Sequence, residues 1–162
     1  MRILKILGDT LNFNKLLQNV ATLCQTRGDF YRAISKYQEI YDSYQADKNT
    51  VTMIFLAIKL SQVYLEIGDF NSAEGLLEKA SLLLPDNKRI AEYRSGAPVD
   101  VTKPLDQQYL KLQIQLCKTY LLGFYLEKGI TLVETLLRFA LPSYHLGSEL
   151  RIMRVKLYIK KR

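Results

Sequence analysis

Residues 54–85 read IFLAIKLSQVYLEIGDFNSAEGLLEKASLLLP, and this stretch predicts a helical hairpin. Apolar and small residues recur at spacings of three and four up to Ile67, as one face of a helix requires. Gly68-Asp69-Phe70 then supplies a turn, and a second helix ends at Pro85. Ala73 is short enough to let the two helix axes approach closely, so a larger residue there would overpack the crossing at a cost of roughly 1–3 kcal/mol.

The same turn occurs 40 residues earlier in the chain, as Gly28-Asp29-Phe30. In both copies an alanine follows the phenylalanine by three residues, at Ala33 and Ala73. Self-similarity with a period of about 20–50 residues is typical of helical-repeat solenoids. The sequence therefore predicts one hairpin over about 12–45 and a second over about 51–85.

The pattern is interrupted over residues 86–104, where two prolines and a glycine occur. Helical spacing over 105–142 indicates a third, degenerate hairpin without a Gly-Asp-Phe turn. A terminal helix without a paired helix is expected over 148–162, with Ser148 as its cap. The expected architecture is a single all-α domain over 1–162: a right-handed α-solenoid of about three antiparallel helix pairs plus a terminal helix.

Composition limits the classes of protein to which the chain could belong. The 162 residues suffice for a core, and no run of 18 apolar residues lacks charge, so we expect no membrane span. Residues 1–8 are too short for a secretory signal. Cys24 and Cys117 fall on predicted buried faces, without partners at metal-ligand spacing. They are interpreted as inert thiols of an intracellular protein, cytoplasmic or, as the alternative, nuclear.

Signals for catalysis are weak in this sequence. His145 is the one histidine, and it lies in a predicted loop with no Ser, Cys or carboxylate motif beside it. Glycine-rich phosphate loops are absent, since Gly123 and Gly129 fall within a helical pattern. We therefore predict a protein that is not an enzyme, with no catalytic residue, no metal site and no cofactor.

Small residues at the helix crossing, a glycine in the turn and a closing proline form a recurrent pattern of helix pairs in repeat proteins. The matching residues of the second hairpin are Ala57, Leu60, Ser61, Tyr64, Gly68, Phe70, Ala73, Ala80 and Pro85. In these residues the chain resembles the tetratricopeptide repeat (TPR) family over about residues 10–142. The 40-residue spacing exceeds the usual period of about 34 and is similar to that of the subclass with longer helices. The resemblance is specific for the fold and carries little information about function.

The resemblance implies a concave groove lined by the first helix of each pair. Carried over position by position, the groove residues are Lys15, Gln18, Thr22 and Gln25 from the first pair, Phe55, Ile58, Gln62 and Leu65 from the second, and Lys111, Ile114, Lys118 and Leu121 from the third. Some members hold an acidic C-terminal peptide with a set of basic and asparagine residues, and the matching positions here are Gln18, Thr22, Lys59, Lys111 and Gln115. The asparagines of that clamp are missing here.

The first helix of the second pair is richer in apolar residues than a surface helix needs. Over residues 51–67, 12 of 17 residues are apolar, and Phe55, Ile58 and Leu65 are surplus to packing within the hairpin. Exposed apolar surface of this kind usually marks a binding site. We expect a partner protein to bind there through a helix or extended segment that is apolar with some acidic character. The alternative is that residues 96–104 or the last helix fill the groove.

Positive charge is concentrated at the C-terminus. The chain has a formal net charge of +7, of which residues 149–162 carry +5 and the remaining chain +2. The cations of this tail are Arg151, Arg154, Lys156, Lys160, Lys161 and Arg162. They are interpreted as the solvated face of a capping helix, with contact to nucleic acid or an anionic surface as the alternative.

Taken together, these patterns predict a non-catalytic protein–protein interaction module, an adaptor or a scaffold subunit of a multisubunit complex. Further solenoid or other subunits could stack at both ends. The alternative is a factor associated with nucleic acid or another anionic surface through its basic C-terminal helix.

Overall fold

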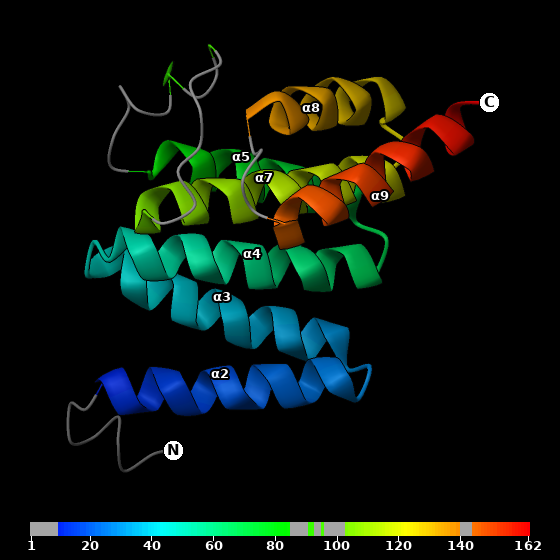
Figure 1. The fold of residues 1–162 in the computed structure, drawn as a ribbon. Helices are drawn as coiled ribbons and strands as arrows, with labels where there is room; N and C mark the ends of the chain where they lie inside the picture. The colour runs from blue at the N-terminus through cyan, green and yellow to red at the C-terminus, as the bar shows by residue number, and fades with distance from the viewer. Residues whose placement is uncertain (1–9, 85–90, 93–94, 96–102, 140–143) are drawn as a thin grey trace.

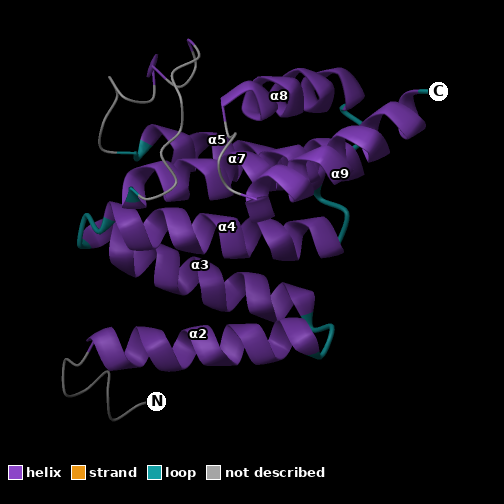
Figure 2. Cartoon of the chain, viewed as in Figure 1, coloured by secondary structure: helices purple, strands orange, loops and turns teal. Residues whose placement is uncertain are grey.

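The computed structural model describes residues 10–84, 91–92, 95, 103–139 and 144–162, and these contain helices and turns but no strand. The helices are α2 (Thr10–Thr26), α3 (Phe30–Ala46), α4 (Thr50–Glu66), α5 (Phe70–Leu82), α7 (Pro104–Leu122), α8 (Leu126–Phe139) and α9 (Tyr144–Lys161). Each of these helices packs against the next one along the chain (Figure 1). Figure 2 shows that short turns join the helices within α2–α5 and between α7 and α8. The all-α class is therefore confirmed.

The two glycine turns have the same conformation. Gly28 and Gly68 have φ angles of +79° and +76°, in the left-handed region that glycine enters at little cost. In both turns the amide of the following aspartate donates a hydrogen bond of 2.9 Å to the carbonyl five residues earlier. The side chain of Asp69 also accepts a 3.0 Å hydrogen bond from the Ser72 amide, which caps α5.

Two further turns have this geometry without a glycine at the left-handed position. Lys48 and Phe124 adopt φ angles of +54° and +61°, and in each case the next amide donates to the carbonyl five residues earlier. Left-handed residues therefore occur at 28, 48 and 68, because α2, α3 and α4 each have 17 residues and three residues separate them. The sequence displays only the 40-residue period because Lys48 occupies the intermediate turn.

Substitution of glycine by alanine should have opposite effects at Gly68 and Gly75. Neither position has a neighbour within 4 Å of an added Cβ atom, so backbone conformation decides the outcome. Gly68→Ala should lower the free energy of unfolding by about 1–2 kcal/mol, because alanine resists the left-handed region. Gly75→Ala, inside α5, should raise it by about 1 kcal/mol. Chemical denaturation of both variants would measure this, and a shared sign would contradict it.

Helix α4 lies at the centre of the core. Leu56, Leu60 and Val63 pack with α2 and α3 in one apolar cluster. Ile54 and Ala57 pack with α5, α7, α8 and α9 in another. Neighbours on several sides explain why α4 is apolar around most of its circumference, since a helix that is surrounded must be apolar on every covered face.

The terminal helix begins earlier than predicted and is packed rather than unpaired. Helix α9 starts at Tyr144, so Ser148 lies inside the helix and the prediction that it is the cap was wrong. Leu150, Met153 and Leu157 are buried in the cluster shared with α7 and α8. These three residues recur at spacings of three and four, so one face of α9 belongs to the core.

Close contact with α8 holds α9 in place. A Cβ atom on Gly129 would lie 2.8 Å from a methyl carbon of Leu157, so the two helices meet where α8 has no side chain. Arg154 forms a 2.7 Å ion pair with Glu134 of α8. Basic residues of the tail therefore also serve to fix the position of the helix that carries them.

Both cysteines are buried and free. Burial raises the pKa of the Cys117 thiol to about 12, because a thiolate would be poorly solvated in the core. The thiol is therefore uncharged at neutral pH and is a poor nucleophile. Within the described part of the chain, no helix is long and apolar enough to cross a membrane.

Candidate binding groove

Helices α4 and α7 form one face of the molecule, with two hollows along it. The two helices run in the same direction in Figure 1, so their N-terminal halves lie at one end of the face and their C-terminal halves at the other. We call this face the α4–α7 groove. The first hollow, of about 320 Å³, lies at the N-terminal end, and the second hollow, of about 750 Å³, lies at the C-terminal end.

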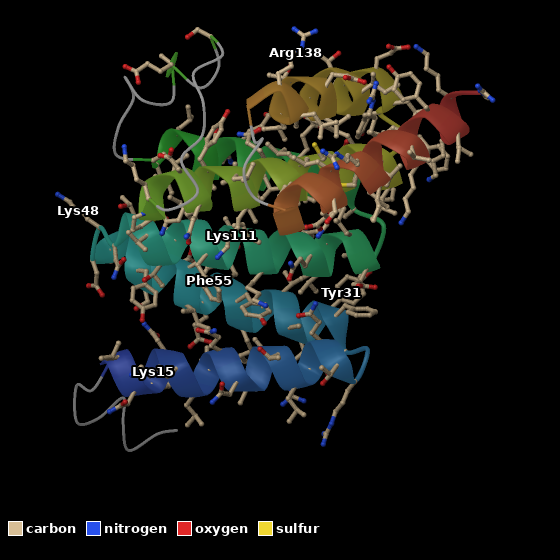
Figure 3. All side chains as sticks on the ribbon, in the orientation of Figure 1. Lys15, Tyr31, Lys48, Phe55, Lys111 and Arg138 are labelled. Carbon is tan, nitrogen blue, oxygen red and sulfur yellow. The ribbon has the colours of Figure 1, made fainter. Side chains whose placement is uncertain are left out.

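The first hollow is mainly apolar. Its residues from α4 are Val51, Thr52, Ile54, Phe55 and Ile58, and those from α7 are Gln108 and Lys111. Phe55 is 43% exposed, although it sits between buried residues of the same helix. The Lys59 ammonium lies 5.9 Å from the centre of the Phe55 ring. Figure 3 labels Phe55 and Lys111, which bring an aromatic ring and a cation to the same hollow.

The second hollow has three walls, because α9 closes one side of it. Helix α4 contributes Gln62, Leu65 and Glu66, α7 contributes Gln115, Lys118, Leu121 and Leu122, and α9 contributes Ser148, Glu149, Ile152, Met153 and Lys156. Apolar side chains from all three helices line it. Across its rim, the Lys118 ammonium forms a 2.7 Å ion pair with Glu149. The volume lies within the range of about 300–1,000 Å³ that is common for ligand sites.

An unpaired polar atom marks the second hollow. Gln115 is only 3% exposed, and its side-chain Nε2 has no hydrogen-bond partner among the residues that the structure describes. A buried donor without an acceptor costs about 1–3 kcal/mol. Most buried polar groups in native proteins are paired, so this amide is an exception, and its Nε2 has less than 1 Å² of accessible surface.

The structure brings together most of the groove residues expected from the second and third pairs. Phe55, Ile58 and Lys111 line the first hollow, and Gln62, Leu65, Lys118 and Leu121 line the second. Ile114 lies in the core instead, at 5% exposure, and Leu121 is 8% exposed. Ile114 and Leu121 are buried because α7 contacts α4, α5, α8 and α9, and these four helices cover most faces of α7.

The expected residues of the first pair lie apart from these two hollows. Lys15, Gln18, Thr22 and Gln25 belong to α2 and line neither one. Thr22 instead contacts the Tyr37 hydroxyl at 3.0 Å and donates to the Gln18 carbonyl at 2.9 Å. Figure 3 places Lys15 on α2, across α3 from α4. The site therefore centres on α4, α7 and α9.

Sequence reasoning missed Leu122 and the contribution of α9. Gln115 was expected only as a position matching the acidic-peptide clamp, and it lines the second hollow. Lys111, Gln115, Lys118 and Leu122 follow one helical face at spacings of four, three and four, a pattern that could have identified Leu122. The α9 residues had no such signal, because their place beside α4 depends on how the last helix folds back over α7. The last helix therefore does not fill the groove completely. Helix α9 forms one wall of the second hollow and leaves its volume open.

Residues 96–104 were the other segment expected to cover the groove. Positions 96–102 of this segment lie outside the described residues. Positions 103 and 104 are exposed at the start of α7. The side chain of His145 is likewise outside the described set. Over the described residues, no group of three or more His, Cys, Asp and Glu side chains could hold a metal ion.

The basic tail is divided between structural contacts and unpaired cations. Arg154 and Lys161 pair with Glu134 and Glu127 of α8, and the second pairing raises the Lys161 pKa. Lys160 donates to the Leu121 carbonyl at 3.2 Å and lies 4.1 Å from the centre of the Phe124 ring. Lys160 forms no ion pair with a described residue, and the same is true of Arg151, Lys156 and Arg162.

No protein-family model matches this chain, and no curated protein or solved structure matches it either. The groove itself is accordingly the basis for a functional proposal.

Proposed function

We propose that the chain is a non-catalytic protein–protein interaction module whose α4–α7 groove binds an apolar, partly acidic segment of another polypeptide. Phe55 is the observation that carries the proposal: a large aromatic side chain, 43% exposed, beside a hollow with apolar walls. Burying such a side chain contributes about 1.5–3 kcal/mol when it is complete. A small number of buried aromatic anchors usually dominates binding to a protein surface.

The lysines that line the groove favour a partner segment with acidic residues. Lys111, Lys118 and Lys156 lie along the two hollows, against Glu66 and Glu149. Glu149 is already paired with Lys118. The groove therefore has an excess of positive charge beside its apolar walls, which favours acidic residues in the bound segment.

We further propose that the helix pairs form a right-handed solenoid of the TPR type. Equal backbone geometry at Gly28 and Gly68 supports this, as does the repeated length of 17 residues in α2, α3 and α4. In such an array the first helices of successive pairs face one side, which agrees with α4 and α7 sharing a groove. An adaptor or scaffold subunit in a larger complex is the role that fits this shape.

A nucleic-acid or anionic-surface role is the second candidate, and the unpaired cations of the tail favour it. Arg151 and Lys156 are exposed on α9, and Arg162 is exposed directly after it. Deleting the tail would not test this role, because Met153 and Leu157 of the same helix are buried. Substitution of these three cations by glutamine removes the charge and keeps the apolar face. Binding driven by phosphate should weaken steeply with salt.

Site-specific photocrosslinking should identify the kind of partner. With p-benzoylphenylalanine in place of Phe55, irradiation in cell extract should join the chain to a discrete protein, because position 55 borders the first hollow. The same group in place of Tyr31, which is 77% exposed on α3, is the matched control and should give no such product. Products that disappear on nuclease treatment, or equal products at both positions, would contradict the proposal.

A further inference from the structure

We infer that the outer face of α9 binds the surface of an anionic lipid bilayer, with its apolar side chains at the boundary of headgroups and acyl chains and its cations among the headgroups. The outer face consists of Ile152, Val155 and Ile159, flanked by Arg151 and Lys156. Of these five residues, Ile152 and Lys156 also border the second hollow, and the other three line neither hollow. Bilayer binding goes beyond the groove, and it gives the second candidate function one defined ligand.

Helix α9 carries an exposed apolar stripe in addition to its buried one. Ile152, Val155 and Ile159 recur at spacings of three and four, which places them on one side of the helix. They are 56%, 57% and 67% exposed. Figure 1 shows α9 on the outside of the molecule, and it packs against α7 and α8. A helix packed on one side is expected to be polar on the other, so this stripe indicates a surface that binds something.

Cations border the exposed stripe on both sides. With 3.6 residues per turn, Arg151 lies on one side of it and Lys156 on the other. Neither forms an ion pair with a residue that the structure describes, and the same holds for Arg162, directly after the helix. The single acid of residues 149–162 is Glu149, which is already paired with Lys118. The outer face is therefore positive throughout and is complementary to an anionic surface.

The combination of stripe and cations favours a bilayer over the other anionic ligands. A nucleic acid would use the cations for its phosphates and leave the aliphatic side chains in water. At a bilayer the aliphatic side chains enter the acyl boundary while the cations stay among the headgroups. Long basic side chains suit this position, because their stems can lie along apolar surface with the charge in water. A second copy of the chain fits poorly, since a symmetric contact would bring like charges together.

Phe124 adds an exposed aromatic ring beside the end of this face. It is 68% exposed in the turn after α7, and the Lys160 ammonium of α9 lies 4.1 Å from the centre of its ring. Lys160 also donates to the Leu121 carbonyl, which fixes the last turn of α9 next to this loop. Phenylalanine beside lysine is common where amphipathic helices meet a bilayer.

Tryptophan fluorescence tests the contact directly, because the chain has no tryptophan of its own. Val155→Trp places a single probe on the outer face, and Tyr31→Trp places one on α3 as the matched control. Each whole chain is titrated with phosphatidylcholine vesicles that contain phosphatidylserine, and with vesicles of phosphatidylcholine alone. The emission of Val155→Trp should shift to shorter wavelength with the anionic vesicles only, and that of Tyr31→Trp should not shift. An unshifted spectrum for Val155→Trp would overturn the inference.

Co-sedimentation with the same vesicles separates the apolar contribution from the charge. Val155→Gln with Ile159→Gln removes the apolar stripe outside the groove, and Arg151→Gln with Arg162→Gln removes two of its cations. All four positions are exposed, so circular dichroism should remain unchanged. Each pair should weaken binding to anionic vesicles by about tenfold or more, because both attractions are needed for stable anchoring. Binding of the Val155 and Ile159 pair at the wild-type level would overturn the inference.

A control pair tests whether any loss of exposed apolar surface has the same effect. Leu11→Gln with Leu82→Gln changes side chains that are 57% and 75% exposed on α2 and α5. This variant should bind anionic vesicles as well as wild type does. An equal loss in the control would mean that α9 has no special part in binding, and it would overturn the inference.

Other occupants of the outer face give different results. A chain that binds a DNA or RNA duplex through Arg151 and Arg162 but does not bind vesicles would overturn the inference in favour of nucleic acid. A wild-type dimer that Val155→Gln with Ile159→Gln converts to a monomer would assign the face to a second copy. Phe55→Asp should leave vesicle binding unchanged, because Phe55 lies in the first hollow. Failure of vesicle binding therefore leaves the groove proposal standing, and failure of photocrosslinking at position 55 leaves this inference standing.

Discussion

Leu157→Ala is expected to lower the free energy of unfolding by about 2–5 kcal/mol, whereas Ile159→Ala should change it by less than about 0.5 kcal/mol. Leu157 is fully buried, and its methyl carbon lies 2.8 Å from where a Cβ atom on Gly129 would be. Ile159 lies two residues further along α9 and is 67% exposed. Truncating Leu157 leaves a cavity between α8 and α9, while truncating Ile159 removes only surface contacts.

Urea denaturation followed by helical circular dichroism would measure both changes. The pair is matched in chemistry, position and helix, so the difference reports burial alone. Equal destabilisation by the two variants would mean that α9 does not pack as described. Because α9 also forms a wall of the second hollow, Leu157→Ala should weaken partner binding only to the extent that it loosens the helix.

Combining Phe55→Asp with Leu122→Asp should weaken partner binding by roughly 30-fold or more while leaving the fold intact. The two residues border different hollows, so one double variant disables both ends of the groove. They are 43% and 44% exposed, so a carboxylate at either position can remain in water. Added negative charge also repels the acidic segment that the lysines of the groove favour. The free energy of unfolding should fall by about 1 kcal/mol at most.

Leu122 tolerates a charged substitution better than Ile58 does. Ile58 is partly buried and packs against the core cluster, so aspartate there would place a charge in apolar surroundings and unfold the protein for reasons unrelated to binding. Tyr31→Asp with Leu82→Asp is the control, because these residues are 77% and 75% exposed and line neither hollow. The readout is binding of the protein that photocrosslinks at position 55. Equal loss in the control would contradict the groove.

The hairpins were predictable because their signals are local. Gly28 and Gly68 favour left-handed turns, and an aspartate at the N-cap position follows each of them, although only the Asp69 side chain accepts a capping hydrogen bond. Asn49 lies at the N-cap position of α4, and its side chain accepts from the Thr52 amide at 3.1 Å. The turns at Lys48 and Phe124 were not predictable in this way. A lysine or phenylalanine in the left-handed region gives no compositional signal, so only the folded chain reveals that these turns are equivalent.

The sequence by itself determined the helices, most of their boundaries and the face of α4 that borders the groove, because helical periodicity and turn chemistry act within a few residues. Only the tertiary structure decided which apolar residues of that face remain exposed to solvent. Ile58 is partly buried against the core cluster, whereas Phe55 is 43% exposed. It also decided that α9 folds back to enclose Gln115. Contacts between helices far apart in the chain set both outcomes, and no local pattern encodes them.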